Sequence, residues 1–171
     1  MREPLFIKSV MRNGVPAPEN HEPIKDLQKT SSQPFDDLSP SEVHEVYWLY
    51  ARNRTGNYPS PTPRSGKWLL FVPKTDIDKV WARVKEASET GRLGADAKVS
   101  TAKPNPNEVN PTDGVICVYT YDSDDERDVM RVREELRALG FTNKIPYKTD
   151  EATLSGKYRR HGERKISKYY C

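Results

Sequence analysis

The chain has 171 residues, of which 35% are hydrophobic and 31% charged, so it is long enough for one ordinary domain and a tail. Its formal net charge of +3 is too small to indicate a nucleic-acid-binding protein, and its two cysteines form neither a disulfide framework nor a zinc site. No apolar run approaches the ~20 residues that cross a bilayer, and the first residues lack the features of a secretory signal. We therefore expect a soluble, reduced, cytoplasmic or nuclear protein that does not bind membranes.

The N-terminal segment differs from the rest of the chain. Residues 1–38 are rich in proline and polar residues and show no sustained period, so we expect an irregular segment there, followed by a single domain over 39–171. The domain opens with SPSE, in which Ser39 is a helix cap, proline takes the first helical position and glutamate stands three residues after the cap. Apolar residues then follow at helical spacing: Val43, Val46, Tyr47 and Tyr50. This pattern predicts a helix over 39–52.

Four strands and two further helices are predicted along the rest of the domain. Short apolar, β-branched and aromatic runs predict the strands, at 67–72, 96–101, 115–121 and 145–149. Capping signals predict one helix that opens near Thr75 and ends at Gly91, and another that opens at Ser123 and ends at Gly140. We therefore expect an α+β fold, with about three helices against one face of a mainly antiparallel sheet.

Four lysines on or beside the predicted strands have small or hydroxylated neighbours. They are Lys67, Lys98, Lys148 and Lys157, each within two residues of glycine, serine or threonine. A phosphate group is bound by ammonium charge, hydroxyl hydrogen bonds and a closely approaching backbone, and this context offers all three. Lysines at strand ends are also common as solvated groups that discourage aggregation. Both interpretations stay open at this point, a shared phosphate site or separate surface charges.

Aromatic residues and histidines offer fewer candidates. Trp68 lies in an apolar strand pattern and is expected in the core, whereas Trp48 lies beside an apolar pattern and is free to stack on a base. His161, in the basic run YRRHGERK, is either part of a solvated loop or a general acid or phosphate ligand beside Lys157. The acidic run at 122–128 covers a predicted helix start, where carboxylates complement the helix dipole. We therefore expect no metal and no cofactor.

Five motifs resemble one family. SGKWLLF, GRLGADAKVST, VICVYTYD, RVREELRALGF and PYKTDEATLSGKY, in this order, are similar to the family that includes the basophilic-leukaemia-expressed protein, over about residues 39–171. The resemblance implies a fold like that of the cap-binding translation initiation factor 4E, a curved antiparallel sheet backed by helices. Members of the family are also described as phosphothreonine-lyase-domain proteins. That description implies removal of phosphate from phosphothreonine by β-elimination.

The resemblance to the lyases also implies roles for individual residues. Lys98 matches the lysine that removes the Cα proton, and the phosphate contacts match a further set: Lys67, Tyr119, Lys148, and Lys157 or Arg159. Clustered cationic groups would lower the pKa of Lys98 and so supply the neutral amine that a base needs. Leu69 stands where the lyases have the histidine acid, and leucine cannot donate a proton. Lys67 or His161 would then have to act as the acid, and without an acid the rate falls by about 10²–10⁴-fold.

These observations leave two main functions. The first is a lyase-like protein that binds a phosphorylated peptide, protein or nucleotide in a lysine-rich pocket and removes its phosphate with Lys98 as base. The alternative is a non-catalytic binder of RNA or of a cap-like nucleotide, in which the same lysines hold phosphate. Cap-binding proteins sandwich a methylated guanine between two tryptophans, and Trp48 and Trp68 are placed differently here. An interaction module without a small ligand is a third interpretation.

Overall fold

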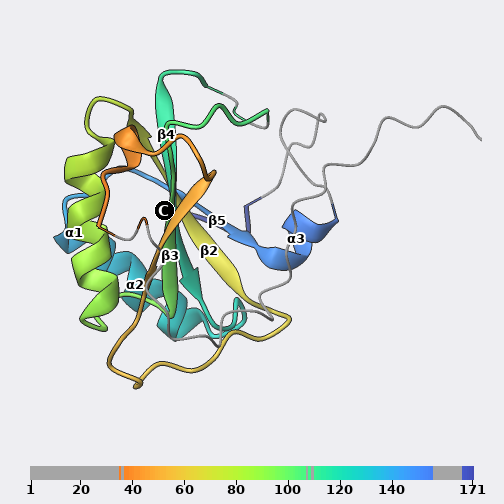
Figure 1. Cartoon of the computed structure of the whole chain (residues 1–171). Coiled ribbons are helices and arrows are strands. Elements are labelled where there is room, and N and C mark those ends of the chain that lie inside the picture. The colour runs from red at the N-terminus through yellow and green to blue at the C-terminus, as the bar shows by residue number, and fades with distance from the viewer. Residues whose placement is uncertain (1–34, 36, 107, 109, 156–166) are drawn as a thin grey trace, which may run out of the picture. The chain divides into compact units, whose positions relative to one another are not determined.

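The structure is a computed structural model of the chain, in which residues 35, 37–106, 108, 110–155 and 167–171 are described (Figure 1). These residues belong to one compact unit that begins at residue 32. Most of the predicted N-terminal segment lies outside the described residues, and so do Lys157, Arg159 and His161. After a 3-10 helical turn at Pro40–Glu42, the elements follow in this order: β1 (Trp48–Arg52), β2 (Gly66–Pro73), α1 (Ile77–Glu89), β3 (Asp96–Ser100), β4 (Asp113–Thr120), α2 (Glu126–Ala138), β5 (Pro146–Thr149), α3 (Asp150–Leu154) and β6 (Tyr169–Tyr170).

The strands form one sheet of six in the order β1-β3-β4-β2-β5-β6, and each neighbouring pair is antiparallel. The long helices α1 and α2 cover the same face of this sheet (Figure 1). The short helix α3 follows β5 directly and contacts β5 and β2. The expected α+β class, a curved antiparallel sheet backed by helices, is confirmed.

The two faces of the sheet differ in chemistry because side chains alternate along each strand. The helix-covered face carries the core, with buried residues from four strands: Leu49, Ala51, Trp68, Leu70, Ala97, Val99, Ile116 and Val118. The apolar positions of α1 and α2 join the same core, and Trp68 lies in it as expected. The opposite face, called the lysine face below, carries a different set: Trp48, Tyr50, Lys67, Leu69, Phe71, Lys98, Cys117, Tyr119 and Lys148.

The helix predicted over 39–52 is wrong. Only the turn at Pro40–Glu42 is helical, and the side chain of Ser39 makes no capping hydrogen bond. Trp48–Arg52 is instead the strand β1, which pairs along its whole length with β3. The aromatic residues of this strand, Trp48 and Tyr50, favour a pleated surface that a partner strand can complete. Their side chains therefore alternate between the core and the lysine face, and Trp48 lies on the lysine face.

The other predicted elements are present, but the start of each long helix differs, and Asp76 rather than Thr75 is the N-cap of α1. Gly91 and Gly140 follow the ends of α1 and α2 as expected, with φ of +80° and +100°, and the left-handed conformation had been predicted for Gly91. The cap of α2 is Asp125 rather than Ser123, because the Asp125 side chain accepts a hydrogen bond from a backbone N–H of the first turn. The helix α3 was not predicted. Among the described residues, no helix is both long and apolar enough to cross a lipid bilayer.

We predict that Gly94→Ala destabilises the domain, because a Cβ at this position would overlap the backbone carbonyl of Tyr119. Overpacking of this kind costs about 1–3 kcal/mol, which urea denaturation measures directly. The matched control is Gly56→Ala, where φ is +69° and no atom lies near the added Cβ, so only the left-handed backbone costs about 1–2 kcal/mol. A Gly94→Ala chain that is no less stable than the Gly56→Ala chain would contradict this close packing.

Candidate functional site

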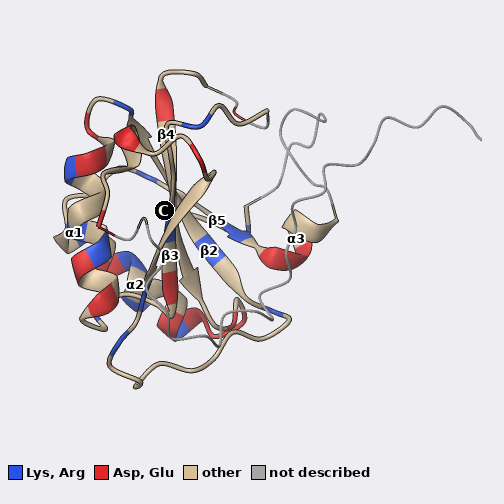
Figure 2. Cartoon of the chain, viewed as in Figure 1, with Lys and Arg blue, Asp and Glu red and all other residues tan. Residues whose placement is uncertain are grey.

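Strand register brings three of the four singled-out lysines onto the lysine face. Lys67 on β2 lies opposite Tyr119 on β4 and opposite Lys148 on β5. Lys98 on β3 lies opposite Cys117, two residues before Tyr119 on the same strand. The basic positions of β2 and β5 are neighbours in Figure 2. These three lysines therefore share one surface, as a common phosphate site requires.

The ring of Tyr119 lies at the centre of this cluster. The Nζ atoms of Lys67 and Lys98 lie 5.2 Å and 5.8 Å from its centroid, and they come from the strands on either side of β4. Lys98 Nζ also lies 4.2 Å from the centroid of the Trp48 ring. Aromatic faces attract ammonium groups by about 0.5–2 kcal/mol, so these rings hold the amines at fixed positions.

Only one of the two central lysines is neutralised by a carboxylate. Lys67 is 8% exposed and forms an ion pair with Asp150, the first residue of α3, at 2.5 Å. Lys98 forms no ion pair or hydrogen bond through its ammonium with any described residue, and the two aromatic rings are its contacts. Because a partly buried charge is stabilised by a partner of opposite charge, an external anion would be stabilised beside this ammonium.

Burial and mutual repulsion lower the pKa of two lysines. Burial, followed by the charge of Lys67, lowers the pKa of Lys148 to about 8. Burial also lowers the pKa of Lys98, with Lys67 acting in the same direction, while Cys117 and Asp150 oppose the change. The direction of the Lys98 pKa change is the one expected from clustered cationic groups. A bound anion would offset this electrostatic cost, which makes the cluster a candidate anion site.

Two other residues of the lysine face limit the reactions that this face could catalyse. Leu69 lies opposite Cys117 and is half-buried, so the position that carries the acid in the lyases holds a hydrocarbon side chain. Cys117 is 4% exposed, and burial raises the pKa of its thiol, so it stays protonated near neutral pH. The roles proposed from the sequence for Lys157, Arg159 and His161 fall on residues that the structure does not describe and stay predictions.

Sequence reasoning missed Asp150 as a member of the site. Asp150 comes two residues after Lys148, but its partner is Lys67, which is 83 residues away in the chain. The antiparallel pairing of β2 with β5 brings them together, and no local motif reports that pairing. Trp48 was singled out because its ring was expected beside the apolar side of a helix, free to stack on a base. It lies instead on the strand β1, where Lys98 Nζ is 4.2 Å from the centroid of its ring.

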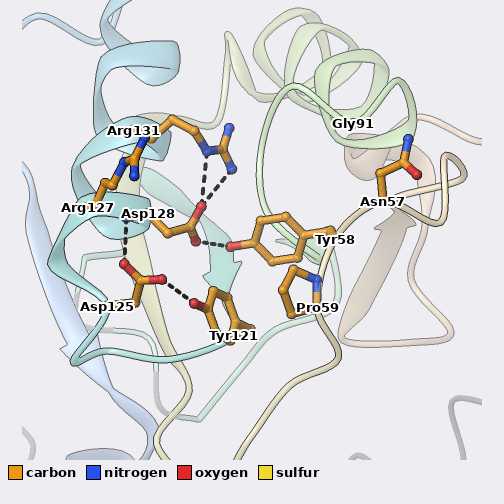
Figure 3. A pocket seen from close by; sticks show the side chains of 9 residues that line it. All are labelled: Asn57, Tyr58, Pro59, Gly91, Tyr121, Asp125, Arg127, Asp128 and Arg131. Atoms are coloured by element: carbon orange, nitrogen blue, oxygen red, sulfur yellow. Dashed lines mark hydrogen bonds and ion pairs between the residues drawn. The ribbon is translucent and has the colours of Figure 1, made fainter.

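A surface hollow elsewhere on the molecule is less suited to bind a charged ligand. Figure 3 shows that it lies between the β1–β2 connection and the start of α2, and that its polar side chains face one another. Tyr58 donates a hydrogen bond to Asp128, which also pairs with Arg131 at 3.0 Å, and Tyr121 donates to Asp125. These groups satisfy each other, so the contacts anchor the β1–β2 connection and leave little for a ligand.

The fold described above is shared with a translation factor. It is similar to schistosome eIF4E in two solved structures, the complexes of that protein with m7GpppA and 4E-BP and with m7GpppG and 4E-BP, with TM-scores of 0.55 and 0.54. In both comparisons the identity is 16%, and the match covers 78% of this chain and 75% of the other. The fold is therefore eIF4E-like.

A comparison with models of protein families assigns the chain to a family. The model described as basophilic leukemia-expressed protein Bles03 matches residues 61–154, which is more than half of the chain. The chain belongs to the Bles03 family. The match includes Lys67, Lys98, Tyr119, Lys148 and Asp150.

We predict opposite stability effects for two substitutions on the lysine face. Lys98→Met removes a partly buried ammonium that has no ion pair with a described carboxylate, so the free energy of unfolding should rise by about 1 kcal/mol. Lys67→Met leaves Asp150 without its ion-pair partner and should lower the free energy of unfolding by about 1–3 kcal/mol. Urea denaturation of both variants tests the charge assignment. Equal effects of the two substitutions would show that Lys98 is neutralised in the folded chain.

Proposed function

We propose that the protein is a non-catalytic binder of a phosphorylated nucleotide or of RNA, which it holds on the lysine face. The observation that carries this proposal is the Lys98 ammonium, which lies between the rings of Trp48 and Tyr119 without a described carboxylate partner. A nucleotide offers both a phosphate for such an amine and a flat base for such rings. Few other classes of ligand carry a phosphate group and a flat aromatic ring so close together.

Each part of the ligand has a suitable partner on this face. The phosphate oxygens accept hydrogen bonds from Lys98 and Lys148, and Lys67 adds a charge that Asp150 partly neutralises. The base stacks on Trp48 or on Tyr50, which is 42% exposed, and stacking of this kind contributes about 1–3 kcal/mol. Since Lys98 Nζ lies 4.2 Å from the Trp48 ring, the phosphate and the stacked base would be neighbours.

The similarity to eIF4E supports a nucleotide ligand at the level of the fold alone. The schistosome protein is complexed with m7GpppA and m7GpppG in the structures compared. A shared fold does not carry function by itself, and the lysine face provides the support that is specific to this chain. Trp68 is fully buried in the core and cannot stack on a ligand, so a sandwich of Trp48 and Trp68 is excluded.

We predict that m7GpppG, GTP or a short single-stranded RNA quenches Trp48 fluorescence and binds in a manner that depends on Lys98. Loss of a charged hydrogen bond costs about 1.5–3 kcal/mol, so Lys98→Ala should weaken binding by about 10–100-fold. For the RNA, each lost phosphate contact should also reduce the salt dependence by about one in log–log slope. Affinity should fall as the pH rises through about 8, because Lys148 then loses its proton.

The control for this titration is Lys79→Ala, an exposed lysine on α1, which covers the other face of the sheet. Its affinity and salt dependence should match those of the unmodified chain. Tight binding that survives both Lys98→Ala and Lys148→Ala would move the site away from the lysine face. Comparison of m7GpppG with GpppG reports whether a methylated base is preferred.

A second candidate function is phosphothreonine β-elimination, which the lowered pKa of Lys98 favours. A neutral amine is able to remove the Cα proton, after which the C–O bond breaks, a carbon–carbon double bond forms and phosphate leaves. Leu69 cannot protonate the leaving phosphate, so Lys67 would have to donate that proton from its position beside Asp150.

We expect at most slow elimination from a phosphothreonine peptide, because loss of a general acid costs about 10²–10⁴-fold in rate. Mass spectrometry of the incubated peptide detects elimination as the loss of phosphoric acid. Activity that disappears in Lys98→Ala and persists in Lys79→Ala would support catalysis. A peptide that stays intact with every chain would leave binding as the function.

A further inference from the structure

Lys98 and Lys67 share one face but differ in the state of their amines. The Lys67 ammonium is held by Asp150 at 2.5 Å, and Asp150 is itself fixed, because its backbone N–H donates to the carbonyl of Ser65 at 2.8 Å. Lys98 has no such partner among the described residues. An amine reacts as a nucleophile only through a free lone pair, so the unpaired lysine is the one available for reaction.

Access to Lys98 is compatible with a reaction. Lys98 is only partly buried, and its Nζ forms no hydrogen bond with a described residue. The rings of Trp48 and Tyr119 form apolar walls on its sides. Desolvation of this kind, next to other cations, is how proteins make a lysine nucleophilic.

The lysines near Lys98 indicate which class of molecule could be positioned to react with it. Lys67 and Lys148 lie opposite each other on β2 and β5, and Tyr119 separates this pair from Lys98. A molecule with a phosphate at one end and a carbonyl carbon at the other would place its phosphate at the pair and its carbonyl at Lys98. The aromatic walls would lie along the part of the molecule between them.

The geometry points to Lys98 as a nucleophilic lysine that forms an imine with phosphorylated aldehydes or ketones. The lone pair of Nζ attacks the carbonyl carbon, the carbonyl oxygen takes up protons and leaves as water, and a C=N bond remains. No oxidant or reductant is consumed, and water reverses the reaction. The inference shares the phosphate-binding lysines with the proposed function but does not require a nucleotide ligand.

The test uses limiting pyridoxal 5′-phosphate as a probe on the full chain, followed by borohydride, which reduces the imine to a stable amine. Peptide mapping by mass spectrometry then gives the extent of labelling at each lysine. We expect Lys98 to be labelled more than the exposed Lys79, since the lowered pKa of Lys98 raises its fraction of neutral amine. Pyridoxal without the phosphate should lose most of this preference, and added inorganic phosphate should protect Lys98.

Two further comparisons make the result decisive. Lys67, which lies on the same face but is paired with Asp150, should be labelled less than Lys98, and Asp150→Asn should raise its labelling. Labelling that follows exposure, with Lys79 ahead of Lys98, would overturn the inference, and so would preferential labelling of Lys148. Selective labelling of Lys98 in a chain that binds no nucleotide would retain the inference and reject the proposed function, and nucleotide binding with unselective labelling would do the reverse.

Discussion

The register of β3, β4, β2 and β5 is the constraint on which the site depends. It places Lys98, Tyr119, Lys67 and Lys148 on one face, and it places Trp68, Val118 and Tyr147, all fully buried, on the other. Because side chains alternate with a period of two, a slip by one residue would bury the lysines and expose the core. The apolar core therefore fixes the positions of the charged residues, although the two sets lie on opposite faces of the sheet.

The clustered lysines of the lysine face lower the stability of the folded chain, and such a cost in free energy points to a functional site. A carboxylate neutralises Lys67, whereas Lys98 is bounded by aromatic rings and its pKa is lowered by burial. Apolar residues at these positions would give a more stable sheet, and strained or destabilised groups often mark functional sites. The same feature supports both the proposed nucleotide binding, which uses the charged amine, and the proposed imine formation, which uses the neutral one.

Membership in the Bles03 family and the eIF4E-like fold do not by themselves choose among the functions proposed for this face. The core position of Trp68 excludes it from stacking on a ligand, so a cap-like nucleotide would have to be held by Trp48 and its neighbours. Leu69 weakens the case for a lyase because the face then lacks the acid that the lyase resemblance implies. Phosphate recognition by the lysines is the element common to both readings.

The sequence by itself determined the fold class, most strands, the two long helices and the glycines that end them, because these depend on local periodicity and on capping. It failed at 39–52, where a capping box and apolar spacing imitate a helix, and pairing with β3 makes a strand of Trp48–Arg52. It also singled out Lys67, Lys98, Tyr119 and Lys148, yet their common face follows from register. Asp150 became a partner of Lys67 only in the tertiary structure, since 83 residues separate them and only the pairing of β2 with β5 makes them neighbours.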